Sequence, residues 1–173
     1  LEAFGQIALE PRVGLTLFAP GGEVEHLPLT GNKRRLMAAV EKIHIFGPVG
    51  DEEWAGSLVK TIKASDWVDL GKDTRRVIVL ISDEPIVQQQ AEKCYAIAKA
   101  AAKHGYRIYG VKVFSGNVAR NPFRREFDRK LTAPDRTKMG GQWAKRKGWE
   151  AYDKIAELTG ARAIIVKVPP SSL

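Results

Sequence analysis

Short, continuously apolar segments alternate along this chain with stretches whose apolar residues recur at helical spacing. The segments are rich in β-branched residues, a composition typical of strands that are buried on both faces of a sheet. The strongest such segment is 75–82, and the others are 106–113, 163–168 and 12–18. After residue 18, the sequence Pro20-Gly21-Gly22 predicts a tight turn into a hairpin partner over residues 23–29, where Pro28 favours an edge strand.

Apolar residues three and four positions apart predict helices over residues 33–45, 52–64, 87–104 and 149–159. Asn32 and Asp51 are suited to cap the first two helices, and Gly105 and Gly160 to end the last two. The order is therefore a hairpin, two helices, then strand, helix, strand, a long segment, helix and strand. This order predicts an α/β fold: a doubly wound, mostly parallel sheet with one antiparallel edge strand and helices on both faces.

The length of 173 residues fits one domain. We expect it to span residues 1–168, with an insert at 114–147 and a C-terminal tail at 169–173. No apolar run approaches the roughly 20 residues of a membrane span, and residues 1–10 lack the features of a signal peptide. Because the sequence begins with Leu rather than Met, we expect a fragment, a processed chain or only the ordered part of something longer. A soluble protein, either cytoplasmic or exported from a precursor, fits these observations.

The residues that could carry catalysis form no recognisable set. Cys94 is the only cysteine, which excludes an intrachain disulfide, and its Ala-rich helical surroundings indicate a small core residue rather than a nucleophile. None of the three histidines pairs with another at ligand spacing, and no glycine-rich stretch has the form of a phosphate loop. We therefore expect a binding protein rather than an enzyme. A hydrolase of the doubly wound class would need a phosphate cradle or a second acid.

Positive charge is concentrated in the insert. Of the formal net charge of +8, the segment from Arg120 to Lys147 carries about +7, from ten basic and three acidic residues. The insert at 114–147 combines these charges with four aromatic residues: Phe114, Phe123, Phe127 and Trp143. This combination predicts contact with nucleic acid or an anionic surface, for which the candidates are Arg124, Arg125, Lys145 and Arg146. The alternative is a solvated loop whose aromatic residues attach it to the domain.

Acidic residues directly follow the strongest strand, in the sequence Ser82-Asp83-Glu84. In parallel sheets, ligands bind outside the carboxyl ends of the strands, so the carboxylate of Asp83 is placed to bind a hard cation or a polar ligand. The alternative is that Asp83 caps the following helix or forms a turn.

Taken together, five segments resemble the von Willebrand factor type A (vWA) domain in order and local sequence, from the second strand of that family to its last. They are RVGLTLF at 12–18, GPVGDEE at 47–53, RRVIVLISD at 75–83, HGYRIYGVKV at 104–113 and IAELTGARAI at 155–164. The resemblance covers nearly the whole chain except the insert. It implies a module that binds a protein partner.

The resemblance also implies a metal-ion-dependent adhesion site that holds Mg²⁺ or Mn²⁺. Asp83 matches the ligand that follows the fourth strand of the family. No Thr stands at the position before the third helix, where Gly50-Asp51 is similar to a Gly-Gly-Asp variant, so Asp51 is the second candidate ligand. The residues next to the two candidate ligands, which we expect to take part in binding, are Ser82, Glu84 and Gly50. The Asp-x-Ser-x-Ser loop of the family is absent from this sequence.

The first strand of the family, which is central in its sheet, has no counterpart either. Each backbone group left unpaired inside a sheet costs about 1–3 kcal/mol, and a domain has only about 5–15 kcal/mol of stability in total. We therefore expect that strand to come from a preceding segment, from another chain or from a rearranged sheet.

Overall fold

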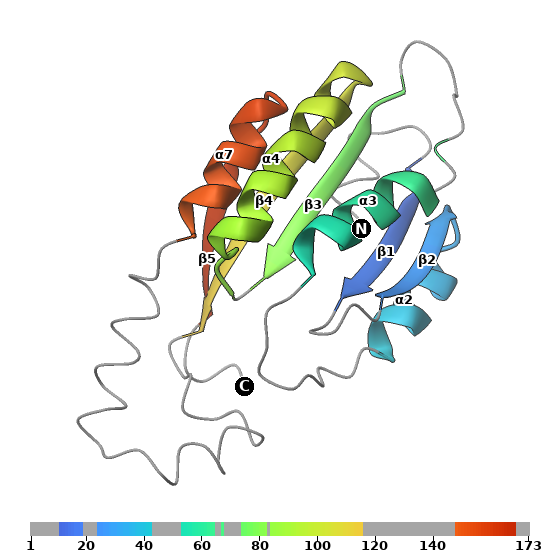
Figure 1. The fold of residues 1–173 in the computed structure, drawn as a ribbon. Coiled ribbons are helices and arrows are strands. Elements are labelled where there is room, and N and C mark those ends of the chain that lie inside the picture. The colour runs from blue at the N-terminus through green and yellow to red at the C-terminus, as the bar shows by residue number, and fades with distance from the viewer. Residues whose placement is uncertain are drawn as a thin grey trace, which may run out of the picture.

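The computed structural model describes residues 11–18, 24–42, 53–64, 67, 74–82, 84–115 and 148–168. These residues form five strands and four helices (Figure 1). The strands are β1 (Val13–Phe18), β2 (Val24–Thr30), β3 (Arg76–Ser82), β4 (Tyr106–Ser115) and β5 (Ala163–Val168). The helices are α2 (Lys33–Glu41), α3 (Trp54–Ala64), α4 (Gln88–Lys103) and α7 (Glu150–Leu158).

The predicted α/β fold class is confirmed, and so are the local signals at several element ends. The side chain of Asn32 accepts a hydrogen bond from the backbone N–H of Arg35 at 3.1 Å and caps α2. Gly105 and Gly160 follow α4 and α7 with φ angles of +76° and +67°, a conformation that glycine adopts without steric cost. The predicted cap of the next helix, Asp51, lies outside the described residues.

The described strands form two sheets rather than the single sheet that we expected. β1 and β2 make an antiparallel hairpin, and β3, β4 and β5 make a parallel sheet with β4 in the middle. β1 and β3 run in the same direction without pairing, and α3 lies across the space between them (Figure 1). Among the described strands, β3 therefore lies at the edge of the three-stranded sheet, with β4 as its neighbour.

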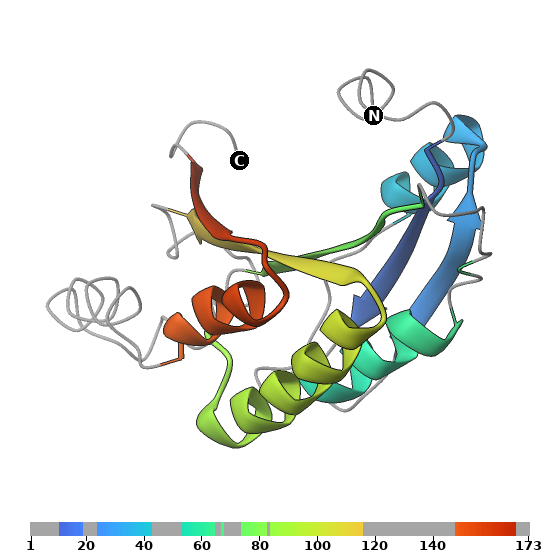
Figure 2. The same ribbon diagram turned by 90° about the horizontal axis from the view of Figure 1, so that it is seen from above.

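The hydrophobic core lies between the three-stranded sheet and its helices. α4 and α7 pack on the same face of this sheet (Figure 2). Ile78 and Leu80 of β3 and Ile108 of β4 point into this layer and are buried. They meet the small residues of α4, including Cys94 and Ala98, which are fully buried. Small side chains on α4 therefore allow the helix to approach the sheet closely.

The opposite face of the three-stranded sheet is exposed, in contrast to the burial on both faces that the sequence predicted. Val77, Val79 and Ile81 of β3 are 39%, 43% and 57% exposed. Ile81 lies beside Val111 of β4, which lies beside Ile164 of β5, so an apolar row crosses the sheet. Both described helices that pack on this sheet, α4 and α7, lie on its other face (Figure 2), which explains why an apolar run is only half buried. No described helix is long and apolar enough to cross a membrane.

This exposed face predicts a measurable property of the chain. Exposed apolar sheet surface binds hydrophobic dyes and promotes self-association. Threonine keeps the β-branched shape, so we consider a variant in which it replaces both Ile81 and Ile164. This variant is expected to bind less anilinonaphthalene sulfonate, measured by the fluorescence of the dye. It should also self-associate less, measured by analytical ultracentrifugation. The free energy of unfolding should change by less than about 0.5 kcal/mol per substitution. Val40→Thr on α2 is the control, because Val40 is also exposed but lies outside the face. Equal dye binding by all three proteins would contradict the prediction.

Candidate binding site at the carboxyl ends of the strands

The carboxyl ends of β1 and β3 point toward the same end of the molecule, where α3 begins (Figure 1). We call this end the rim, and define it by the described residues Phe18, Glu53, Ser82, Glu84 and Gly148. Of the residues predicted for the site, Ser82 and Glu84 lie on the rim. The other seven lie outside the described residues: Gly50, Asp51, Asp83, Arg124, Arg125, Lys145 and Arg146.

Hydrogen bonds fix the backbone on each side of position 83. The hydroxyl of Ser82 accepts a hydrogen bond from the backbone N–H of Glu84 at 3.0 Å, which makes a short serine turn. The carbonyl of Glu84 in turn accepts a hydrogen bond from the hydroxyl of Tyr152 at 2.7 Å. Tyr152 is fully buried on α7. The loop after β3 is therefore attached to α7 by a buried donor.

A cluster of aromatic side chains lies beneath the rim and joins its segments. Trp54, at the start of α3, contacts Phe18 of β1 with ring centroids 4.7 Å apart and Tyr152 of α7 at 5.6 Å, both edge to face. Trp149 stacks on Tyr152 at 5.7 Å. Such pairs add about 0.5–1.5 kcal/mol each beyond the area they bury. The cluster therefore connects the end of β1 to the starts of α3 and α7 and provides a rigid base for the rim.

A polar network holds α3 against α4 on the same rim. One carboxylate oxygen of Glu53 accepts a hydrogen bond from the backbone N–H of Gly56 at 3.1 Å, so Glu53 caps the first turn of α3. Its other oxygen accepts one from the amide of Gln90 at 3.0 Å, and the amide oxygen of Gln90 accepts one from the N–H of Ala55 at 3.2 Å. Neither Glu53 nor Gln90 was predicted from the sequence. An acid in the first turn of the predicted helix 52–64 was the signal for Glu53, whereas no local signal indicated Gln90.

The chain returns from the insert at Gly148 in very close contact with the loop after β3. Gly148 has a φ of +117°, and a Cβ built at this position would lie 2.2 Å from the carbonyl oxygen of Ile86. Its N–H donates to the carboxylate of Glu150 at 2.9 Å. Only glycine fits such an approach. The described chain therefore resumes after the insert at the rim, next to the loop after β3.

One ion pair links the strand that leads into the insert to the helix that comes after it. The ammonium of Lys112, on β4, lies 2.9 Å from both carboxylate oxygens of Asp153 on α7. The Lys112 side chain is 9% exposed, whereas that of Asp153 is 57% exposed. Because Lys112 is buried and Asp153 is its acceptor, we interpret this pair as a structural connection between β4 and α7 rather than as part of a ligand site.

The chemistry of the described residues supports the expected role of Cys94. Its side chain is fully buried in α4. Burial, with a smaller effect of the nearby Glu53 carboxylate, raises the pKa of the Cys94 thiol to about 12. A thiol with this pKa is protonated at neutral pH and is a poor nucleophile. Within the described ranges, no group of three His, Cys, Asp or Glu side chains is arranged to hold a metal ion, and both candidate ligands, Asp51 and Asp83, lie outside them.

Comparison with known proteins identifies the fold. A scan against models of protein families gave no match, and neither did a search of curated proteins. Similar solved structures include the SpRpn10 VWA domain, which superposes with a TM-score of 0.58 at 15% sequence identity, covering 97% of this chain and 70% of that chain. They also include the conserved hypothetical protein BatB from Bacteroides thetaiotaomicron, which superposes with a TM-score of 0.62 at 19% identity, covering 91% of this chain and 72% of that chain.

These similarities agree with the mixed α/β architecture of the described residues. At these identities they identify the fold and leave the function open. The chain is a vWA-type domain in its fold.

Proposed function

We propose that this protein is a binding module that recognises a protein partner through the rim. The observation that carries the proposal is the convergence of separate segments on one rigid base. The end of β1, the loop after β3 and the starts of α3 and α7 are connected by the aromatic cluster and by the bond from Tyr152 to Glu84. Loops held by a rigid scaffold are the usual location of recognition residues.

The partner should contact residues near Glu84. A photoreactive amino acid placed at Glu84 is expected to cross-link a partner from an extract of the cells that express the protein, and an excess of unlabelled chain should compete for it. The same amino acid at Glu92, an exposed acidic position on α4, is the matched control. A product formed equally well from both positions would contradict recognition at the rim.

The finer form of the proposal is that a divalent cation takes part in this recognition. Asp83 follows β3, and Asp51 precedes α3, so each belongs to a segment that borders the rim. Carboxylate oxygens are the ligands that Mg²⁺ and Mn²⁺ prefer. Asp83 would be a direct ligand or would accept a hydrogen bond from a metal-bound water, and Asp51 would be the second carboxylate. When bound, the cation would supply an open coordination position for an acidic side chain of the partner.

Calorimetry tests the metal part by itself. Titrating the chain with Mg²⁺ or Mn²⁺ is expected to give a saturable heat that is lost in Asp83→Ala and reduced in Asp51→Ala, because each removes a carboxylate ligand. Glu92→Ala should behave as the wild type. Absence of heat in the wild type, or an unchanged heat in Asp83→Ala, would remove the cation from the proposal, while the cross-linking experiment would still test binding at the rim.

The basic insert supports a second candidate, the binding of single-stranded nucleic acid. Gly148, the residue that follows the insert, lies on the rim, so a ligand bound to this end of the insert would lie beside the loop after β3. If four phosphates are contacted, the affinity for an oligonucleotide should fall about fiftyfold between 50 and 200 mM salt. Fluorescence anisotropy measures this slope. Replacing residues 116–147 with a Gly-Ser linker should abolish binding, and retention of binding would exclude this candidate.

A further inference from the structure

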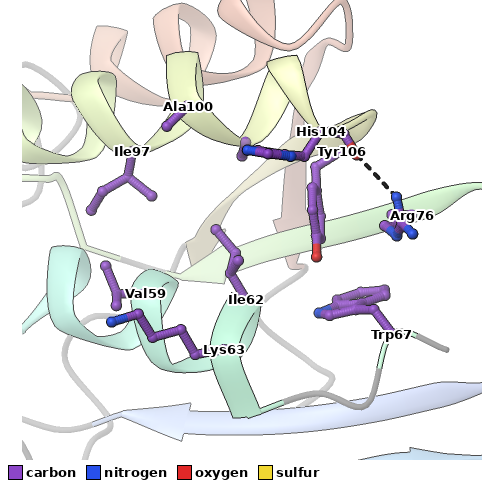
Figure 3. Close-up of a pocket in the computed structure, with 10 residues that line it drawn as sticks. Val59, Ile62, Lys63, Trp67, Arg76, Ile97, Ala100, His104 and Tyr106 are labelled. Atoms are coloured by element: carbon purple, nitrogen blue, oxygen red, sulfur yellow. Dashed lines mark hydrogen bonds between the residues drawn. The ribbon is translucent and has the colours of Figure 1, made fainter. Parts of the chain in front are cut away.

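A hollow lies at the opposite end of the sheet from the rim. It has a volume of about 440 Å³ and lies between α3, α4 and the first residues of β3 and β4 (Figure 3). Arg76 and Ser82 occupy the two ends of β3, about 20 Å apart at the rise of a strand. A ligand in the hollow would therefore bind whether or not the rim has the proposed function.

Apolar side chains form most of the walls of the hollow. Val59 and Ile62 come from α3, Ile97 and Ala100 from α4, and the rings of Trp67 and Tyr106 close another side. The two rings meet edge to face, with centroids 5.2 Å apart. Figure 3 shows the aliphatic side chains and the rings arranged around the same space. This volume and this lining are typical of sites that take a small molecule with an apolar body.

The two cations that border the hollow do not require a charged ligand. The guanidinium of Arg76 lies over the Tyr106 ring, 5.6 Å from its centroid, and donates to the carbonyl of His104 at 3.1 Å. Lys63 is exposed on α3, where water solvates its ammonium. Burial raises the pKa of the Tyr106 hydroxyl, so this ring is uncharged at neutral pH. The apolar walls therefore favour a neutral molecule, because an ion loses its hydration on entering them.

The indole N–H of Trp67 indicates which polar group the ligand carries. Its nitrogen is one of the buried polar atoms of the described residues that have no hydrogen-bond partner. In Figure 3 this nitrogen lies at the end of the ring that points toward Ile62. An indole N–H can only donate, and a buried donor without an acceptor is costly. A ligand that brings an acceptor oxygen into the hollow would recover this free energy.

We propose that this hollow binds a small, neutral, ring-bearing molecule that carries a carbonyl or another acceptor oxygen. The ring of the ligand packs between α3 and α4 against the rings of Trp67 and Tyr106, and the oxygen accepts a hydrogen bond from the Trp67 indole. A hydrocarbon of the same shape makes the same apolar contacts but leaves the donor unpaired. The signature of the site is therefore that the Trp67 donor strengthens binding of the oxygen-bearing molecule and not of the hydrocarbon.

The test compares acetophenone with α-methylstyrene, in which a CH₂ group replaces the carbonyl oxygen, as ligands of the full chain. In ¹⁵N–¹H NMR spectra, acetophenone is expected to move the Trp67 indole N–H signal downfield saturably, because a new hydrogen bond deshields the proton. The hydrocarbon should not move it downfield. The spectrum of Trp67→Phe identifies this signal among those of the four tryptophans. No shift with acetophenone, or an equal shift with both ligands, would overturn the proposal.

The same variant measures the contribution of the donor. Trp67→Phe keeps a ring in the wall and removes the N–H, so it should lower the affinity for acetophenone, relative to that for α-methylstyrene, by about tenfold. Both ligands meet the same altered wall, and the ratio of their affinities therefore cancels the change in its shape. An unchanged ratio would contradict a role of the donor.

A substitution at an exposed helix position tests where the ligands bind. Ala100→Phe should fill the space between α3 and α4 and abolish binding of both ligands, while the circular dichroism spectrum stays that of the wild type. Ala96→Phe is the matched control, because it adds the same side chain at an exposed position of α4 outside the lining. Wild-type affinity in Ala100→Phe, or an equal loss in both variants, would mean that the ligands bind elsewhere.

Discussion

Replacing Trp54 with alanine is expected to lower the free energy of unfolding by about 3–5 kcal/mol, the range for removal of a buried aromatic side chain from a core. This is a large fraction of the total stability of a domain, about 5–15 kcal/mol. We therefore expect Trp54→Ala to be largely unfolded at moderate temperature. Denaturant unfolding followed by circular dichroism measures the change.

The size of the effect comes from the position of the side chain. Trp54 is 2% exposed and contacts Phe18 on one side and Tyr152 on the other. These partners belong to β1 and α7. Removing the indole leaves a cavity at the point where α3, the hairpin and α7 meet, and the backbone elements around it are too rigid to collapse into the space.

Two comparisons make this prediction specific. Trp54→Phe keeps an aromatic ring in the cluster and should recover about half of the lost stability. Met37→Ala removes a large apolar side chain from α2 that is 41% exposed and should cost less than about 1 kcal/mol. If Trp54→Ala and Met37→Ala were equally stable, the aromatic cluster would not be the base of the rim.

Replacing Gly148 with alanine is expected to cost about 3 kcal/mol or more, through two effects that add. A φ of +117° strains any residue with a Cβ, and the new atom would lie 2.2 Å from the carbonyl oxygen of Ile86, so one of the two backbones must move. The melting temperature should fall in proportion. Because Gly148 connects the insert to α7, any ligand that contacts the insert should also bind less tightly.

The matched control is Gly105→Ala. Gly105 also has a positive φ, +76°, but no atom lies within 4 Å of the position that its Cβ would take. Its substitution should therefore cost only the conformational strain, about 1–2 kcal/mol. A difference between the two variants isolates the contact with Ile86. If Gly148→Ala were no less stable than Gly105→Ala, the close approach would be without energetic importance.

The elements of the fold were largely predictable from local sequence. Asn32 caps α2, Gly105 and Gly160 follow α4 and α7 in the left-handed conformation, and the β-branched runs at 75–82 and 163–168 form strands β3 and β5. These signals act within a few residues of the chain, through backbone sterics and single hydrogen bonds, and tertiary contacts rarely reverse them. The burial of Cys94 was predicted for the same reason, since it repeats with alanines along one face of a helix.

The pairing of the strands and the contacts at each end of the sheet were decided only by the tertiary structure. An apolar run such as Val77–Ile81 is compatible with burial on both faces or on one, and the sequence does not state which segments cover it. Three features bring together residues that are far apart in the chain. They are the hydrogen bond from Tyr152 to Glu84, the contact of Trp54 with Phe18, and the hollow that Trp67 lines together with residues of α3 and α4 (Figure 3). Such contacts depend on how whole helices pack against strands. The local sequence pattern determines on which face of a helix or strand a residue lies, but it does not determine which distant residue that face contacts. Local periodicity therefore determined which helices and strands form. Long-range packing determined how these elements are arranged at the rim and around the hollow.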